Sequence, residues 1–141
     1  AAELLGIAQE TFDVALQYLK ERKQFGVLIG SFQALQHRAA HWWSEVELCK
    51  SVVLKALQSI DEGDDKSPAL ASIAKAKLCE IAELATNEAI QMHGGIGMTD
   101  ELGVSHYFKR VHLLARLYGD ESYYLSRYMT LSGDEPVARA S

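Results

Sequence analysis

The sequence predicts an all-α protein, an up-and-down four-helix bundle, and three observations support this fold. Apolar residues recur at three- and four-residue spacing along most of the chain, which is typical of amphipathic helices. No stretch alternates apolar and polar residues as a half-buried strand would. Breaks rich in glycine, proline or acidic residues separate four long helical segments, and short connections between long helices favour an up-and-down bundle.

The first two helices follow from their apolar stripes. The first runs from the start of the chain to residues 22–26, where Gly26 ends the pattern. Its stripe consists of Leu4, Leu5, Ala8, Phe12, Ala15, Leu16 and Leu19. Ser31 is a suitable N-cap for the second helix, and the acidic loop 61–65 ends it. We expect this helix to bury Phe32, Leu35, Ala39, Trp42, Val46, Cys49, Val53, Ala56 and Ile60.

The remaining segments are defined by their breaks. Ser67 and Pro68 form a typical start for the third helix, since proline suits the first helical position. Its predicted buried face consists of Leu70, Ile73, Ala74, Leu78, Ile81, Leu84, Ala85 and Ala89. A fourth helical stretch is expected over residues 104–129, with a break at Gly119 and Asp120. The bundle domain would cover residues 1–131, and residues 132–141 should form a frayed tail.

Composition limits the function classes. A chain of 141 residues fits one domain, and 48% apolar with 23% charged residues is ordinary for a globular protein. A net charge of −5 argues against nucleic acid or an anionic membrane as partner. No apolar run approaches membrane-spanning length. Cys49 and Cys79 fall in apolar helical registers and are expected to be buried thiols in a reducing compartment. Because the chain starts inside a helical pattern without methionine, we expect a piece of a longer protein.

Residues 91–101 concentrate glycine between two helical segments, with Gly94, Gly95 and Gly97 inside four positions. Glycine is unfavourable within a helix, so this cluster indicates a turn or a close backbone approach. Backbone N–H groups exposed there could bind an anion, whereas the alternative is an ordinary helix C-cap.

A second candidate element lies at the end of the first helix. Arg22 could bind a phosphate through its planar guanidinium, or it could compensate the helix dipole together with Lys23. Gln24, Phe25 and Gln33 could hydrogen-bond to and stack on a purine ring; otherwise they belong to a loop and a helix start.

The remaining candidates have ordinary structural interpretations beside the functional ones. His37 and His41 are one turn apart, as metal ligands can be, but the sequence contains no Glu-x-x-His and we expect no metal site. The basic and aromatic start of the fourth segment, from His106 to Arg116, could be a solvated face or could face an anionic cofactor or subunit. Asp120 follows Gly119 and is either a helix N-cap or a catalytic carboxylate.

The motifs together resemble one family. They are Leu-Gly-Ile-Ala-Gln at 5–9, Glu-Arg-Lys-Gln-Phe-Gly at 21–26, Ile-Gly-Ser-Phe-Gln at 29–33, Gln-Met-His-Gly-Gly-Ile-Gly at 91–97, Glu101, and Phe-Lys-Arg at 108–110. In this order and spacing they are similar to the C-terminal helical domain of acyl-CoA dehydrogenases. The resemblance covers nearly the whole chain and specifies no particular acyl group.

The resemblance implies an FAD enzyme that removes a hydride from the β-carbon of an acyl-CoA while a base takes the α-proton. An N-terminal helical domain and a middle β-domain would be absent here, and the FAD would be shared between subunits of a dimer or tetramer. By resemblance, Arg22, Gln24, Phe25 and Gln33 would hold the ADP half of the cofactor, with Gln91, Met92, His93, Gly94 and Gly95 alongside. An electron-transfer flavoprotein would be the acceptor, in the bacterial cytoplasm or the mitochondrial matrix.

One position departs from the family pattern. Many members carry the catalytic glutamate in a Tyr-Glu-Gly-Thr motif, whereas this chain has Tyr-Gly-Asp-Glu-Ser at 118–122, with Gly119 in the glutamate's place. Asp120 could be the base, a helix preceding Ala1 could supply it, or the chain could be the non-catalytic subunit of a heteromeric dehydrogenase. A helical interaction module that has lost the flavin is the alternative outside the enzyme class.

Overall fold

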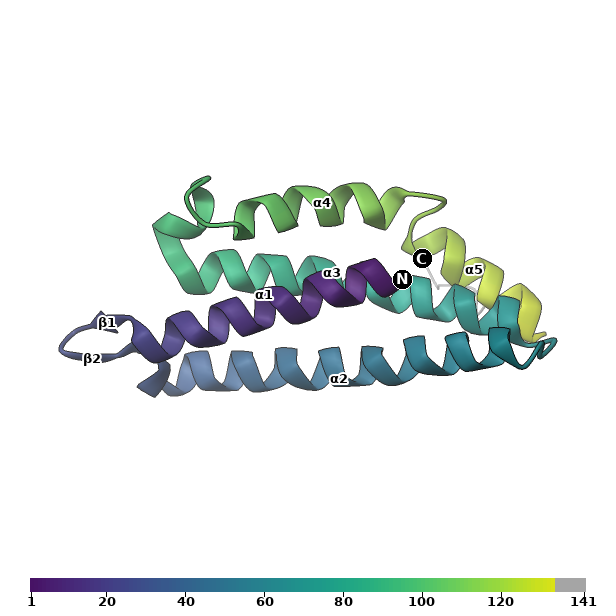
Figure 1. Cartoon of the computed structure of the whole chain (residues 1–141), viewed down its shortest axis with the longest axis horizontal. Coiled ribbons are helices and arrows are strands. Elements are labelled where there is room, and N and C mark those ends of the chain that lie inside the picture. The colour runs from purple at the N-terminus through teal and green to yellow at the C-terminus, as the bar shows by residue number, and fades with distance from the viewer. Residues whose placement is uncertain (134–141) are drawn as a thin grey trace, which may run out of the picture.

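The predicted all-α class is confirmed. The computed structural model describes residues 1–133, and these contain five α-helices joined by short connections (Figure 1). The helices are α1 (Ala2–Glu21), α2 (Gln33–Asp61), α3 (Ser67–His93), α4 (Val104–Arg116) and α5 (Glu121–Ser132). The frayed tail predicted for residues 132–141 lies outside the described residues, except that Ser132 and Gly133 form the end of α5.

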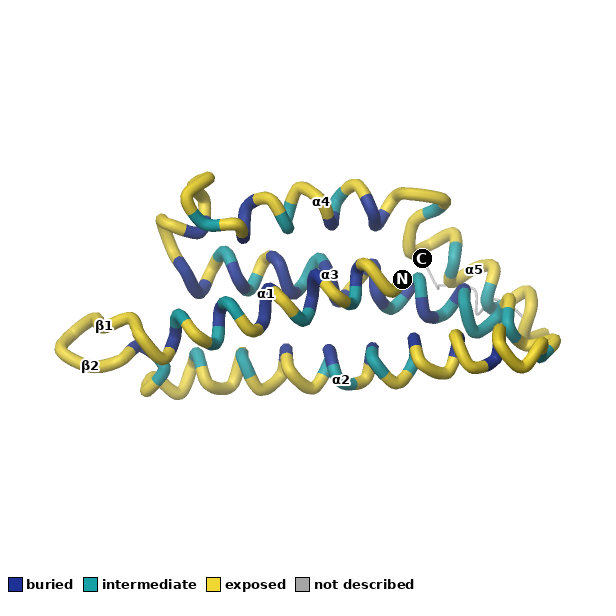
Figure 2. The backbone as a smooth tube through the Cα atoms, in the orientation of Figure 1, coloured by how far each residue is buried: buried dark blue, intermediate teal, exposed yellow. Residues whose placement is uncertain are grey.

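Helix α3 is the centre of the bundle and packs against each of the other four helices (Figure 1). Figure 2 shows buried residues along most of its length, on more than one side. Ala74, Ala82, Ala85 and Ala89 are almost fully buried. Their small side chains let the surrounding helices approach closely, which a helix covered on several sides requires.

The predicted fourth helix is in fact two helices. Residues 104–129 were expected to form one segment with a break at Gly119 and Asp120, and the break separates α4 from α5. Tyr118 and Gly119 adopt positive φ angles of 64° and 121°, which ends α4. The Asp120 side chain then accepts a hydrogen bond from the Tyr123 backbone N–H at 2.9 Å. Asp120 is therefore an N-cap, which was one of the two interpretations of this residue.

The sequence shows no strand pattern, yet the structure contains two very short strands. Strands β1 (Lys23–Gln24) and β2 (Val27–Leu28) form a small antiparallel hairpin that projects beyond the end of α1 (Figure 1). Two residues per strand are too few to produce an alternating pattern. The two central turn residues, Phe25 and Gly26, have φ angles of 53° and 80°, as a tight two-residue hairpin turn requires.

The start of α2 also differs from the expectation. Ser31 belongs to a 3-10 turn, η1 (Ile29–Ser31), and its hydroxyl donates to the Leu28 carbonyl, so Phe32 rather than Ser31 is the N-cap residue. Gly30 permits this turn, because a Cβ at that position would lie 2.7 Å from the Leu19 carbonyl oxygen. The hairpin is thereby seated directly on the last turn of α1.

The core follows the predicted stripes with some exceptions. Trp42 is 1% exposed and packs edge-to-face on Phe12, with ring centroids 5.1 Å apart. Phe32 and Ile60, which were expected to be buried, are 38% and 54% exposed. Each lies near an end of α2 and lines a cleft there instead of the packed core. Cys49 and Cys79 are buried and carry free thiols, as predicted.

The two neighbouring tryptophans of α2 provide a matched test of this core. We expect Trp42→Ala to lower the free energy of unfolding by roughly 3–5 kcal/mol, because it leaves a large cavity against Phe12. Trp43 is 49% exposed, and Trp43→Ala should change stability by about 0.5 kcal/mol. Urea denaturation followed by circular dichroism would measure both. Equal losses in the two variants would contradict the described packing.

Alkaline pH should destabilise the bundle through Cys49. Burial raises the pKa of this thiol from 9.0 to about 11. The unfolded chain therefore ionises first, so the stabilising contribution is complete below pH 9 and is lost as the pH rises towards 11. The loss should be roughly 2 kcal/mol. Comparing denaturation curves of wild type and Cys49→Ala across this range would test it, and a parallel decline in both proteins would argue against the assignment.

Candidate functional site

The two elements singled out in the sequence lie on the two sides of one cleft. This hairpin cleft, with a volume of about 440 Å³, is located at the end of the bundle where α1 and α3 both finish. Tyr18, Arg22, Gln24 and Phe25 line one side, and residues 91–96 line the other. The cleft therefore brings together segments that are far apart in the sequence.

The three glycines of the predicted cluster have different roles. Gly94 has a φ of +65° and ends α3, so it serves the turn. Gly97 serves close packing, because a Cβ there would lie 2.8 Å from the Ile90 carbonyl oxygen. Gly95 has neither constraint: its φ is not positive, and a Cβ at this position would meet no atom of the described residues within 4 Å. The fold of the described residues does not require glycine at 95, so its small size is available for a ligand to approach the backbone.

The electrostatics of the cleft depend on Arg22. The C-terminal ends of α1 and α3 are the negative ends of their dipoles, so the helices themselves do not attract an anion. The Gly94 N–H already donates to the carbonyls of Gln91 and Ile90, so Gly94 itself is a helix C-cap, which was one of the two interpretations of this cluster. Within residues 1–133 Arg22 forms no ion pair. Its guanidinium is thus the lining group best suited to bind a phosphate.

Phe25 is the most unusual residue of the cleft. It is 91% exposed, although it is a large apolar side chain. Its φ of 53° is also unfavourable, since the left-handed region costs a residue with a Cβ roughly 1–2 kcal/mol. Phe32 lies edge-on to it with ring centroids 6.3 Å apart. An exposed aromatic ring in a strained turn indicates a residue selected for contact with another molecule.

The floor of the cleft is formed by buried residues of α3. Met92 and His93 are each 5% exposed. His93 Nδ1 lies 2.7 Å from the Ala89 carbonyl oxygen, which fixes the orientation of the imidazole. Tyr18 packs on the same ring, with centroids 4.4 Å apart. A polar but preorganised floor of this kind suits recognition of a ligand ring or hydroxyl.

One residue predicted for the site lies outside the cleft, and several residues that line the cleft were not predicted. Gln33 is exposed at the start of α2 and is not among the residues that line the cleft. Tyr18, Phe32 and Ile96 do line it and were not predicted. Tyr18 could have been found from its position four residues before Arg22, on the same face of α1. Phe32 was assigned to the core because of the stripe that it continues.

The other candidates of the sequence lie elsewhere. His37 and His41 are exposed on α2, and residues 1–133 contain no group of three histidine, cysteine, aspartate or glutamate side chains placed to hold a metal. On α4, Lys109 pairs with Asp100 at 3.4 Å and Arg110 with Glu3 at 2.6 Å. Much of that basic face is therefore engaged within the bundle.

A second cleft, here called the N-terminal cleft, lies beside the start of α1 and has a volume of about 480 Å³. Its walls are mainly apolar and include Lys75, Leu117 and Tyr118. Gly119 cannot simply be replaced by a residue with a side chain, because a Cβ there would lie 2.5 Å from the Tyr123 ring. Asp120 does not line either cleft, and its carboxylate caps α5.

None of the helices described is both long and apolar enough to cross a membrane.

Comparisons with known proteins agree on one family. Residues 1–127 match the family described as "Acyl-CoA dehydrogenase, C-terminal domain". A probable acyl-CoA dehydrogenase of Bacillus subtilis (strain 168) is 43% identical over 116 residues, which are 81% of this chain and 30% of that protein. Butyryl-CoA dehydrogenase from Megasphaera elsdenii superimposes with a TM-score of 0.88 and 29% identity, covering 92% of this chain and 33% of that one.

A further solved structure, the FAD complex of PigA, has a TM-score of 0.86 and 26% identity, covering 92% of this chain and 34% of that one. The chain thus spans about a third of the length of each of these proteins.

The strain at Phe25 leads to a test of the cleft that needs no ligand. Phe25→Asn should raise the free energy of unfolding by about 0.5–1 kcal/mol, because asparagine tolerates the left-handed region and the lost ring is already exposed. Phe32→Ala is the control, since asparagine at this N-cap position would itself stabilise α2. Phe32 has a φ of −77° and is 38% exposed, so no strain is relieved, buried ring area is lost and stability should fall. A destabilised Phe25→Asn variant in urea denaturation would show that the ring stabilises the fold.

Proposed function

We propose, because the chain belongs to the acyl-CoA dehydrogenase family, that it is the C-terminal domain of an FAD-dependent enzyme that dehydrogenates an acyl-CoA between its α- and β-carbons. Its own task would be to hold the ADP half of FAD in the hairpin cleft and to contribute to the subunit interface. The observation that carries this proposal is the convergence of Arg22, Phe25 and residues 91–95 on that cleft.

The residues present fit an adenosine diphosphate. Arg22 supplies a guanidinium for the pyrophosphate at a place where two helix ends offer only carbonyls. Phe25 offers an exposed face to a flat base, and Gly95 leaves space for close approach to the backbone. Gln24 and Gln91 add polar groups from both sides. Gln33 lies at the margin, and a role for it requires a ligand that extends beyond the cleft.

FAD, when bound, would accept the hydride that leaves the β-carbon of the acyl group. The chain's own contribution to removal of the α-proton is less direct. Gly119 has no carboxylate, and the side chain of Asp120 is occupied as an N-cap. We therefore favour a base supplied by a helix that precedes Ala1 or by a homologous partner subunit over Asp120 itself.

Assembly into a dimer or tetramer is supported by the outer face of α2. Trp43, Leu48 and Leu54 are all about half exposed there, away from the buried stripe of the helix. Such an apolar face is unusual on a monomer and is typical of subunit interfaces. The partner would be a second copy or a homologous subunit. We also propose an electron-transfer flavoprotein as the acceptor and a location in the bacterial cytoplasm or the mitochondrial matrix.

The rival proposal is that the chain belongs to the non-catalytic subunit of a heteromeric dehydrogenase, which the missing carboxylate at Gly119 favours. Such a subunit would bind FAD at the hairpin cleft but would need a partner for turnover. A flavin-free helical interaction module would give a colourless full-length protein. Flavin content and acyl-CoA reduction of the full-length protein, alone and with a partner, separate the three possibilities.

FAD binding should depend on Arg22 in the full-length protein. Arg22→Met is expected to weaken FAD binding roughly tenfold or more, since a hydrogen bond to a charged group is worth about 1.5–3 kcal/mol. Arg22→Lys should recover only part of the loss, because an ammonium cannot make the paired contact. Lys20→Met, two residues away on α1, is the matched control. Flavin absorbance after dialysis measures the effect, and equal retention in all variants would refute the assigned role.

The 141-residue chain alone should show no turnover. The flavin ring would need the β-domain that the resemblance places outside this chain, so added FAD cannot be positioned against a substrate. Dye reduction with butyryl-CoA, octanoyl-CoA or palmitoyl-CoA should stay at the level of the buffer blank. Turnover of any of the three thioesters by this chain with FAD would contradict the proposal that catalysis requires the β-domain.

A further inference from the structure

The end of α4 is held in an unusual way. A helix ends with four carbonyls that lack a donor within the helix. In α4 the first and the last of these carbonyls accept from backbone N–H groups just beyond the helix. Leu113 O accepts from the Leu117 N–H at 3.1 Å, and Arg116 O accepts from the Gly119 N–H at 3.2 Å.

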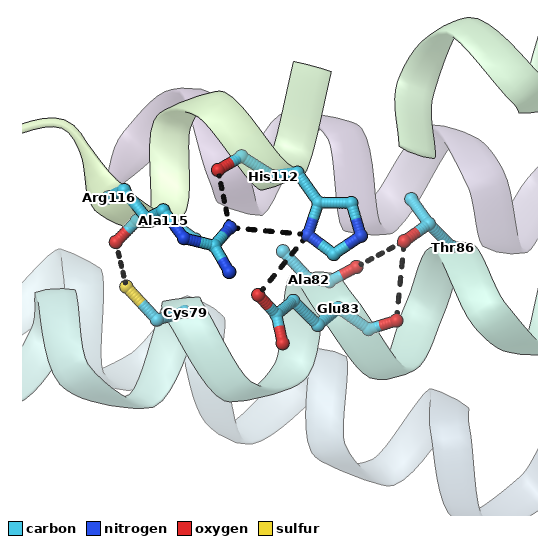
Figure 3. A network of polar contacts seen from close by, with 7 residues as sticks. All are labelled: Cys79, Ala82, Glu83, Thr86, His112, Ala115 and Arg116. Atoms are coloured by element: carbon cyan, nitrogen blue, oxygen red, sulfur yellow. Dashed lines mark hydrogen bonds and ion pairs between the residues drawn. The ribbon is translucent and has the colours of Figure 1, made fainter. Parts of the chain in front are cut away.

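The two carbonyls between them accept from side chains of α3. Lys75 Nζ donates to Leu114 O at 2.5 Å, and the Cys79 thiol donates to Ala115 O at 3.3 Å; Figure 3 draws the thiol contact. Lys75 and Cys79 are one turn apart on α3 and therefore share a face. Burial raises the pKa of the Cys79 thiol, which thus keeps the proton that it donates. Every terminal carbonyl of α4 has a donor.

The Lys75 ammonium is committed to this helix end. A cation at the C-terminal end of a helix interacts favourably with its dipole. Within residues 1–133 Lys75 forms no ion pair with a carboxylate. Lys77, two positions further along α3, is different: its ammonium lies 2.9 Å from Glu45 and 3.2 Å from Glu80. The two ammonium groups are therefore chemically alike, but one binds a helix end and the other binds carboxylates.

The anchored end leads directly into the turn between α4 and α5. Tyr118 and Gly119 have the positive φ angles described above, and the Tyr124 hydroxyl donates to the Tyr118 carbonyl at 3.0 Å. Asp120 fixes the far side by capping α5. Tyr118 is 84% exposed and, with Lys75, lines the N-terminal cleft. Since the turn is strained, its path depends on anchors on both sides.

We propose that Lys75 is a positioning residue for the acyl-CoA site. Its ammonium holds the end of α4 and thereby sets the position of the turn formed by Tyr118, Gly119 and Asp120. The inference rests on the proposed function, in which this turn stands where many family members carry the catalytic glutamate. Lys75 itself does not have to touch the substrate.

The test uses the full-length FAD-loaded protein and three variants. Lys75→Met removes the donor at similar length, Lys75→Arg restores a cationic donor, and Lys77→Met is the matched control. Three quantities are measured: bound FAD per chain, hydrogen–deuterium exchange of the segment 113–124, and the second-order rate constant for anaerobic flavin reduction by butyryl-, octanoyl- or palmitoyl-CoA, whichever reduces wild type fastest.

Lys75→Met should keep its FAD, because the hairpin cleft is at the other end of α3. Its exchange in segment 113–124 should rise about tenfold and its reduction rate constant should fall about tenfold, as expected for loss of a charged hydrogen bond. Lys75→Arg should recover most of both, and Lys77→Met should change neither.

Two results would overturn the inference alone: a Lys75→Met protein that behaves like Lys77→Met, or one that loses FAD in parallel with acyl-CoA reduction. A wild-type protein without FAD, or one that none of the three thioesters reduces, would overturn the proposed catalytic function and this inference with it.

Discussion

The packing of α3 against all four other helices is the constraint on which the remainder of the structure depends. A helix covered on several sides must use small residues, and its buried alanines allow α1, α2, α4 and α5 to approach it. Because α3 runs the length of the bundle, it also supplies part of both clefts. Its last turn and residues 94–96 form one wall of the hairpin cleft, and Lys75 near its start lines the N-terminal cleft.

Much of this arrangement could be predicted from the sequence, because it follows from periodic burial. The stripes of α1 and α3, the burial of Trp42 and the break after α4 all result from three- and four-residue spacing or from glycine. The hairpin could not be found in that way. It is too short to alternate, and its turn places Phe25 in a conformation that phenylalanine does not favour. The conformational preference of Phe25 is overridden there by the close contact of the hairpin with the end of α1, which Gly30 permits.

The candidate site shows the same division. Arg22 and residues 91–95 were predicted by motif and lie on one cleft, whereas Tyr18 and Phe32 became visible only when the elements were placed in space. The structure also separates glycines that look equivalent in the sequence. Gly94 and Gly97 are explained by the chain's own backbone, and of these three only Gly95 is left for a ligand. Within residues 1–133, both non-glycine residues with positive φ, Phe25 and Tyr118, are exposed aromatics that line a cleft. Local strain thus coincides with both clefts.

Helix α1 begins at one cleft and ends at the other: Leu4 lines the first, and Tyr18 and Arg22 line the second. Its 20 residues give it a length of about 30 Å, at 1.5 Å per residue, and this length sets the spacing of the two clefts. The helix also sets an angular phase, because each residue added or removed would turn one end by about 100° relative to the other. A single insertion in the middle of α1 would leave the helix intact and yet rotate Tyr18 and Arg22 away from their cleft. The number of residues in α1 therefore fixes both the distance between the two clefts and the orientation of their α1 residues relative to each other.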